Sequence, residues 1–125
     1  MPRAQALTMA VQPVPAPVLG TFLIDTGASC TCVDPDFIQS LGLQPTGRIG
    51  IRTPSTPPAA AHFCDQFDVS IFIPGPGTAG HLVPALPVVT TQLRSQGIDG
   101  LIGRDVLNGC ALIYNGTASS CTLAY

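Results

Sequence analysis

The sequence predicts a mainly β protein, and three features support this class. Thirteen Gly and thirteen Pro favour frequent turns between short strands. Only 10% of residues are charged, and because every acidic residue is Asp and every basic one Arg, the helix formers Lys and Glu are absent. In residues 67–73 the apolar Phe67, Val69, Ile71 and Ile73 alternate with Asp68, Ser70 and Phe72, a pattern of half-buried strands.

The length of 125 residues, with a hydrophobic fraction of 46%, is enough for one domain with its own core. We expect one domain over residues 1–125. Residues 1–20 are expected to be a Pro-rich lead-in and a possible interface strand, and residues 21–125 the core.

The first half of the chain is expected to contain strands, one short helix and a hairpin. In chain order these are strands at 6–11, 18–24 and 30–33, a helix at 37–41, and a hairpin with strands at 48–53 and 63–73. Asp34 or Asp36 is expected to cap the helix, and Gly42 to end it.

The second half is expected to continue with a strand at 81–89, which Pro84 and Pro87 interrupt. An apolar run at 98–103 precedes a short helix at 104–108. Two strands, 111–114 and 121–125, then follow around a turn. The turn sequence Asn115-Gly116-Thr117 also matches a glycosylation sequon, but Asn-Gly is typical of hairpin turns and we favour the turn.

The charge distribution argues against nucleic acid as a partner. The formal charge is −2, the pI is about 5.3, and the five Arg are scattered along the sequence. The N-terminal residues make a poor signal peptide. No apolar stretch approaches the roughly 18 residues of a membrane span, so we expect a soluble chain without membrane contact and favour the cytoplasm.

The cysteines and histidines predict neither a metal site nor a cofactor. Five Cys form an odd set, so we expect mostly reduced thiols. Cys30 and Cys32 form a lone Cys-x-Cys pattern without the second pair that zinc sites need. His62 and His81 have no nucleophile motif beside them, which favours surface or supporting roles.

Asp25 is the strongest candidate for chemistry. It comes where a buried strand ends, and a carboxylate held there is rigid and partly out of water. Thr26 offers a small hydroxyl for hydrogen bonding, and Gly27 lets a substrate backbone approach closely. Taken alone, however, Asp-Thr-Gly is also a sequence that commonly forms a turn between two strands.

A second segment of the sequence strengthens the interpretation of Asp25 as a functional residue. Leu23-Ile24-Asp25-Thr26-Gly27-Ala28, followed much later by Leu101-Ile102-Gly103-Arg104-Asp105-Val106-Leu107, resembles the retropepsin family of aspartic peptidases. The resemblance covers residues 22–125. It implies a closed β barrel with a flap hairpin and one short C-terminal helix, acting as a homodimer.

The resemblance also implies residue roles. Asp25 would be catalytic, Thr26, Gly27 and Ala28 would support the active site, Gly27, Ile98 and Leu101 would contact substrate, and Ile102, Gly103 and Arg104 would be structural. Because the sequence holds one Asp-Thr-Gly, the second catalytic Asp25 would come from a second copy. The expected activity is an aspartic endopeptidase acting on peptides or proteins, with an acid-shifted pH profile.

Two departures from the family pattern are visible. The expected flap, residues 49–67, has Pro54, Pro57 and Pro58 at its tip where retroviral flaps are glycine-rich. Ser29 and Cys30 follow the active-site segment where some members have acidic residues, which puts in doubt an ion pair with Arg104.

Two other interpretations of the same residues stay open. One is a retropepsin-like module that dimerises or binds peptides without cutting them. The other is a structural β domain in which Asp25 only forms a turn.

Overall fold

The computed structural model describes residues 16–51 and 62–125, which form two β-sheets and three short helical segments. The strands are β1 (Phe22–Ile24), β2 (Cys32–Val33), β3 (Gly47–Ile51), β4 (His62–Pro74), β5 (Gly80–Thr90), β6 (Gly100–Ile102), β7 (Ala111–Asn115) and β8 (Ser120–Ala124). The helical segments are α2 (Pro35–Ser40), the 3₁₀ turn η1 (Arg94–Gln96) and α3 (Arg104–Leu107). The mainly β class is confirmed.

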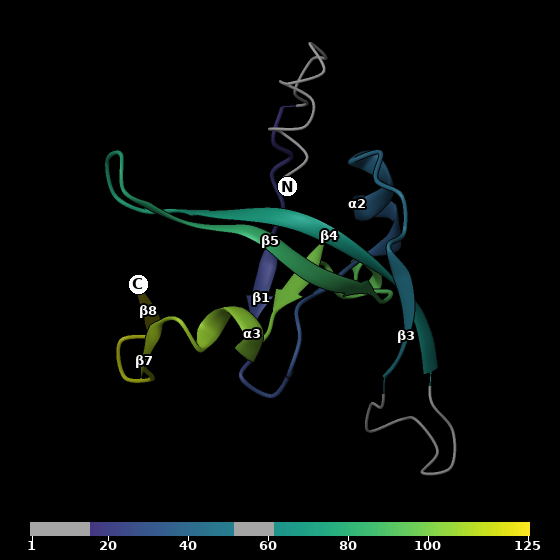
Figure 1. Ribbon diagram of the computed structural model, residues 1–125. Helices are drawn as coiled ribbons and strands as arrows, with labels where there is room; N and C mark the ends of the chain where they lie inside the picture. Colours follow the sequence, from purple (N-terminus) through teal and green to yellow (C-terminus); the bar gives the residue numbers. More distant parts are fainter. Residues whose placement is uncertain (1–15, 52–61) are drawn as a thin grey trace.

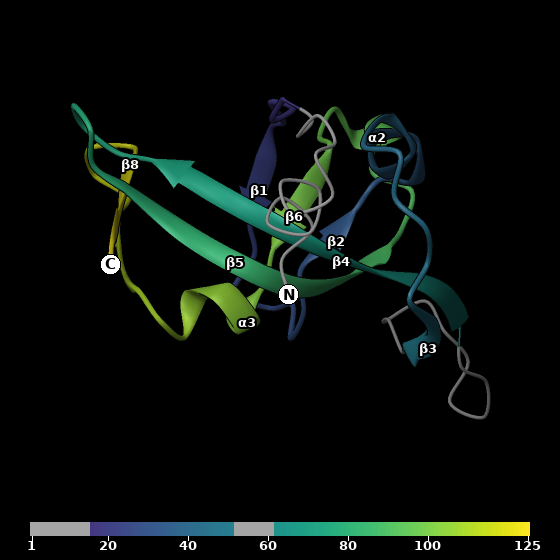
Figure 2. The same cartoon turned by 45° about the horizontal axis from the view of Figure 1, so that its top comes forward.

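The larger sheet has six strands in the order β1-β6-β2-β5-β4-β3. β1 pairs parallel to β6 and β2 pairs parallel to β5, while the remaining neighbours are antiparallel. The long β4–β5 pair crosses the shorter strands at an angle (Figures 1 and 2). β7 and β8 form a separate two-stranded sheet.

The expected closed barrel is not found among the described residues. Closure requires the two edge strands of a sheet to pair with each other. Here the edges are β1, which pairs with β6, and β3, which pairs with β4, and they lie at opposite ends of the strand order. The described sheet is therefore open.

The predicted hairpin at 48–53 and 63–73 is confirmed for its described part. β3 and β4 pair in register from Gly47↔Gln66 to Ile51↔His62. The proline-containing tip lies outside the described residues, as do the expected strand at 6–11 and most of the lead-in.

The helix α2 begins at Pro35, two residues earlier than expected, because Asp34 is its cap. Asp34 has an extended backbone, and its Oδ1 accepts a hydrogen bond of 2.9 Å from the Asp36 N–H. Pro35 fits the first helical position, where no N–H is needed. Gly42 follows the helix with φ +63°, as expected of a terminator.

The strand β5 runs through Pro84 and Pro87, which were expected to interrupt it. The β4–β5 register instead shifts between Val69 and Ile71, opposite this stretch of β5. The Ser70 hydroxyl, at the shift, donates to the Pro84 carbonyl. Pro84 therefore lies at the local irregularity, whereas Pro87 stands in register opposite Asp68.

The core lies on both faces of the larger sheet, because neighbouring residues along a strand point to opposite faces. Leu23, Leu101, Cys32 and Val89 are in register across β1, β6, β2 and β5 and share one face. The buried residues of this second cluster are Cys32, Cys64, Val89 and Leu93. Those of the larger cluster, on the other side, are Val33, Phe37, Ile38, Phe67, Leu86, Val88, Ile102, Val106 and Leu107.

None of the described helices is long and apolar enough to cross a membrane.

Candidate active site

Asp25 directly follows β1, and the β1–β6 pairing continues into it. Its N–H donates to the Ile102 carbonyl at 2.9 Å, one residue beyond the strand. The Ala28 N–H donates to the Asp25 carbonyl at 3.2 Å and closes a turn, residues 25–28, which we call the Asp25 loop. The Asp25 side chain is half-buried, and its Oδ1 accepts a hydrogen bond of 2.9 Å from the Gly27 N–H. The carboxylate is thus oriented by its own turn.

Gly27 fits this turn because it has no Cβ. A Cβ built there would lie 3.1 Å from Asp25 Oδ1, tighter than ordinary van der Waals contact. Thr26 and Gly27 are both exposed at the loop surface. The surface of the loop at these two residues is therefore accessible to a substrate or to another protein chain.

Gly103 and Arg104 hold the Asp25 loop from the other side. A Cβ on Gly103 would lie 2.5 Å from the Cys30 carbonyl carbon and 2.6 Å from its oxygen, so only glycine fits. The Arg104 N–H donates to the Ala28 carbonyl, and Arg104 Nη1 donates to the Thr26 carbonyl, both at 2.9 Å. The two segments singled out from the sequence are in direct contact.

Arg104 binds the loop through backbone carbonyls rather than through an ion pair. Within the described residues the ion pairs are Arg48–Asp65 at 3.7 Å and Arg94–Asp99 at 3.3 Å. This agrees with the absence of an acidic residue at Ser29 and Cys30.

Thr31 is a supporting residue that the sequence did not single out. It is fully buried, and its hydroxyl accepts from the Gly103 N–H at 3.1 Å and donates to Asp105 Oδ1 at 2.7 Å. The Thr31 N–H donates to Asp105 Oδ2 at 2.8 Å. Asp105 therefore connects the start of β2 to α3.

Ile98 and Leu101 lie on the face of the second core cluster, where both are half-buried. Leu23, in register with Leu101 on this face, is 52% exposed. An apolar strip thus extends along the sheet beside the Asp25 loop. It is chemically suited to contact apolar side chains.

Three free thiols belong to the same cluster. Cys32 and Cys64 are buried and Cys30 is half-buried against them. Burial raises the pKa of Cys32 to about 12, and the neighbouring Cys30 and Cys64 add to this shift. Burial also raises the pKa of Cys64. These two thiols are poor nucleophiles at neutral pH.

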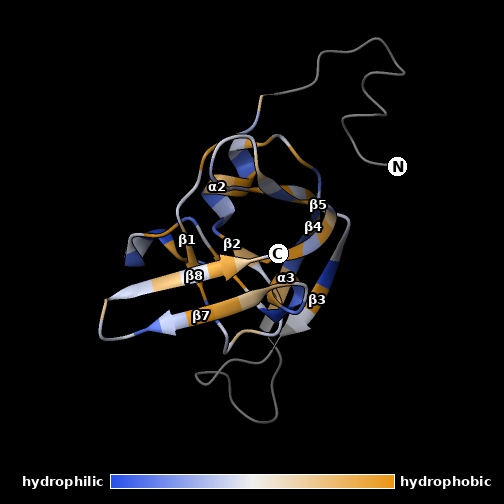
Figure 3. Cartoon of the chain, turned by 90° about the vertical axis from the view of Figure 1, so that its left-hand side faces the viewer, coloured by the Kyte–Doolittle hydropathy of each residue, from blue (hydrophilic) through white to orange (hydrophobic). Residues whose placement is uncertain are grey.

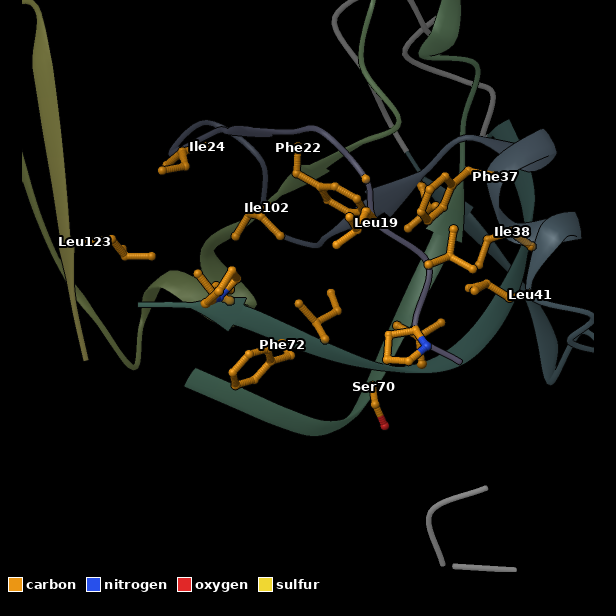
Figure 4. Close-up of a pocket in the computed structure, with 18 residues that line it drawn as sticks. Leu19, Phe22, Ile24, Phe37, Ile38, Leu41, Ser70, Phe72, Ile102 and Leu123 are labelled. Atoms are coloured by element: carbon orange, nitrogen blue, oxygen red, sulfur yellow. The ribbon is translucent and has the colours of Figure 1, made fainter. Parts of the chain in front are cut away.

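A cavity of about 450 Å³ lies in the described part of the chain, and none of the residues that line it belongs to the Asp25 loop. Side chains of the larger core cluster line it, among them Phe22, Ile24, Phe37 and Ile102 (Figure 4). No titratable side chain lines it, and the hydroxyl of Ser70 is already bonded to Pro84. It has no catalytic groups.

No group of three or more His, Cys or Asp side chains in the described ranges is arranged to hold a metal ion. His81 stacks on Tyr125 with ring centroids 5.0 Å apart and an interplanar angle of 24°.

Comparison with known proteins matches the region of the chain that contains both segments. Residues 15–106 match the model of a retropepsin-like aspartyl protease family. This matched range includes the Asp25 loop, Gly103 and Arg104. No curated protein matches the chain. Because the matched region spans most of the chain, this protein belongs to the aspartyl protease family.

Proposed function

We propose that the chain is an aspartic endopeptidase whose active form is a homodimer, with one Asp25 from each subunit. The observation that carries this proposal is the position of Asp25. It stands at the end of β1 in a turn that Arg104 holds by two hydrogen bonds, while Gly103 packs against Cys30 just beyond the turn. The family supports a protease-like activity.

The second subunit is required by chemistry. The sequence holds one Asp-Thr-Gly, and peptide hydrolysis by this class needs both an acid and a base. Two carboxylates roughly 3 Å apart do not both ionise readily, a behaviour already known for aspartic proteases. One Asp25 would then stay protonated while its copy accepts a proton.

The reaction would use a water molecule held between the two carboxylates. The ionised Asp25 takes a proton from this water as its oxygen attacks the peptide carbonyl carbon, while the protonated Asp25 donates to the carbonyl oxygen. Collapse of the tetrahedral intermediate breaks the C–N bond, and the amine leaves with a proton from the dyad. This scheme uses only the water molecule and the two carboxylates, without a cofactor.

The substrate would be an extended peptide with apolar side chains. The strip of Leu23, Ile98 and Leu101 supports this, because it presents apolar surface beside the Asp25 loop. The β3–β4 hairpin is proposed as the flap that closes over the peptide and excludes water.

The test compares the wild type with Asp25→Asn on a mixed peptide library across pH 3 to 8. We expect cleavage with an acid-shifted profile for the wild type and none above background for Asp25→Asn. Asp68→Asn, which changes an exposed carboxylate on β4, is the matched control and should cleave normally. Equal cleavage by wild type and Asp25→Asn, or a flat pH profile, would contradict the mechanism.

A transition-state-mimicking inhibitor of aspartic peptidases should raise the thermal unfolding midpoint of the wild type. Inhibitor binding without any cleavage would instead indicate a peptide-binding module with an idle dyad.

A further inference from the structure

The sequence contains two Asn residues, Asn108 and Asn115, and Gly follows each of them. In an Asn-Gly pair the backbone nitrogen of Gly can attack the amide carbon of the Asn side chain, because Gly has no Cβ to crowd the approach. Both Asn residues and both following Gly residues are exposed. Access to water therefore does not distinguish the two sites, and the local backbone must.

Asn108 lies at the end of α3, where hydrogen bonds hold the backbone on both sides of it. It has φ −64° and ψ −18°, and its N–H donates to the Arg104 carbonyl at 2.8 Å. The Gly109 N–H, whose nitrogen would attack, donates to the Val106 carbonyl at 3.1 Å. This hydrogen bond favours the protonated nitrogen and keeps it in the helical end. The structure thus protects Asn108.

Asn115 is the last residue of β7, and Gly116 begins the turn that joins β7 to β8. Figure 3 shows this turn at the left-hand edge of the molecule. The Gly116 carbonyl accepts from the Ser119 N–H at 3.3 Å, but the Gly116 N–H donates to no acceptor within residues 16–51 and 62–125. The nitrogen that would attack Asn115 is therefore open to solvent bases.

The side chain of Asn115 is oriented by its own turn. Its Oδ1 accepts a hydrogen bond of 3.1 Å from the Ala118 N–H. Attack on the amide carbon Cγ moves negative charge onto Oδ1, and a positioned backbone N–H stabilises charge that develops in this way. The turn thus supplies an oxyanion donor to Asn115.

We propose that Asn115 is a modification site at which the folded chain deamidates without an enzyme. A base in solution removes the Gly116 N–H proton, the nitrogen bonds to Asn115 Cγ, and the Cγ–Nδ2 bond breaks as ammonia leaves with a proton from water. Water then opens the cyclic imide. Opening at the side-chain carbonyl gives isoaspartate or aspartate according to which C–N bond of the ring breaks, so the net change is gain of water and loss of ammonia.

Both products place a new carboxylate at the turn of a chain whose formal charge is already −2. Isoaspartate also lengthens the main chain by a methylene group, next to the pair Asn115↔Ser120 that closes the hairpin. The product has the group that isoaspartyl methyltransferases recognise, so such an enzyme is the expected partner of the modified chain. This inference does not depend on the proposed peptidase activity.

The test incubates the unsubstituted chain at pH 8, outside the acid-shifted range of the proposed dyad, and maps its peptides by mass spectrometry. Chymotrypsin cuts after Tyr114 and separates the two Asn residues. The acid form should accumulate at Asn115 at least about tenfold faster than at Asn108, and in urea the two rates should converge because local structure is lost. A methyltransferase specific for isoaspartate should label the Asn115 peptide. An unmodified Asn115 in the folded chain, or equal rates there, would overturn the proposal.

A matched pair of variants tests the attacking nitrogen. Gly116→Ala should slow deamidation of Asn115 at least about tenfold, because a Cβ crowds the nitrogen. Its Cβ would make only ordinary contact with the Tyr114 ring, at 3.4 Å or more, so the hairpin should fold. Gly109→Ala is the control and should leave the Asn115 rate unchanged. An unchanged rate in Gly116→Ala would refute the mechanism.

Discussion

Both carboxylate oxygens of Asp105 accept hydrogen bonds from Thr31, one from the backbone N–H at 2.8 Å and one from the hydroxyl at 2.7 Å. The same hydroxyl accepts from the Gly103 N–H. One buried side chain therefore joins the strand that leaves the Asp25 loop to the segment that braces it.

Thr31→Val should destabilise the protein by about 1–3 kcal/mol, because the buried Gly103 N–H loses its acceptor and Asp105 loses a donor. Urea unfolding gives this value, and cleavage should fall with it. Thr46→Val is the control, since the Thr46 hydroxyl bonds to Gln66 at an exposed site. An equal loss in both variants would contradict a special role for Thr31.

Asp34 should contribute to the pH dependence of stability. Its burial alone would raise the pKa, but the N–H groups of Leu93, Arg94 and Asp36 donate to the carboxylate and lower it below the ordinary 3.8. A lowered folded-state pKa stabilises the protein above the unfolded value. This contribution is lost as pH falls below about 3.8 and through the folded pKa.

The measurement compares urea unfolding of Asp34→Asn and the unsubstituted chain at pH 7 and pH 3, in an Asp25→Asn background. The difference in unfolding free energy between these two proteins should be large at pH 7 and smaller at pH 3. Asp68→Asn, at an exposed position, should show little difference at either pH. A difference in unfolding free energy between Asp34→Asn and the unsubstituted chain that is larger at pH 3 than at pH 7 would refute the assignment.

Gly103→Ala should cost about 2–3 kcal/mol and most of the activity, because the new Cβ would collide with the Cys30 backbone. The cause is steric, since Gly103 has an ordinary φ of −93°. Gly109→Ala is the control, because its Cβ would meet its nearest neighbour at an unstrained 3.6 Å. Thermal unfolding and cleavage assays of both variants should separate them clearly.

Cys32 and Cys64 should resist alkylation in the folded protein. At pH 8 a thiol with a pKa near 12 has roughly a thousandfold less thiolate than one at the ordinary 9.0, and burial excludes the reagent as well. Mass spectrometry after iodoacetamide treatment should find both residues modified in urea but not in buffer. Rapid labelling of the native protein would mean that this cluster is open to solvent.

Local sequence was sufficient for the elements near the site. Asp34 was one of two candidates, with Asp36, for the helix cap, because capping depends on residues within one turn, and the structure selects Asp34. The second strand of the Pro-rich hairpin, expected at 63–73, was recognised by its alternation. Gly103 and Arg104 were recognised through a resemblance, and the structure explains them by contact with Cys30, Thr26 and Ala28.

The errors concern contacts between distant residues. The closed barrel was expected from the family, but the pairing of edge strands depends on long-range register that local periodicity does not encode. Pro84 and Pro87 were expected to interrupt a strand, but β5 runs through both, with Pro84 at a register shift and Pro87 in register opposite Asp68. Thr31 went unnoticed because its partners, Gly103 and Asp105, lie far along the chain.

The sequence by itself determined the β class, the strand that ends at Asp25, and the presence of a single Asp-Thr-Gly. These follow from composition, alternation and count, which are local properties. The tertiary structure alone decided that Thr31 and Asp105 join the start of β2 to α3, that Leu101 shares a face with Leu23, and that β7 and β8 form a separate sheet. Each of these depends on which strands meet, and that is settled only when the core packs.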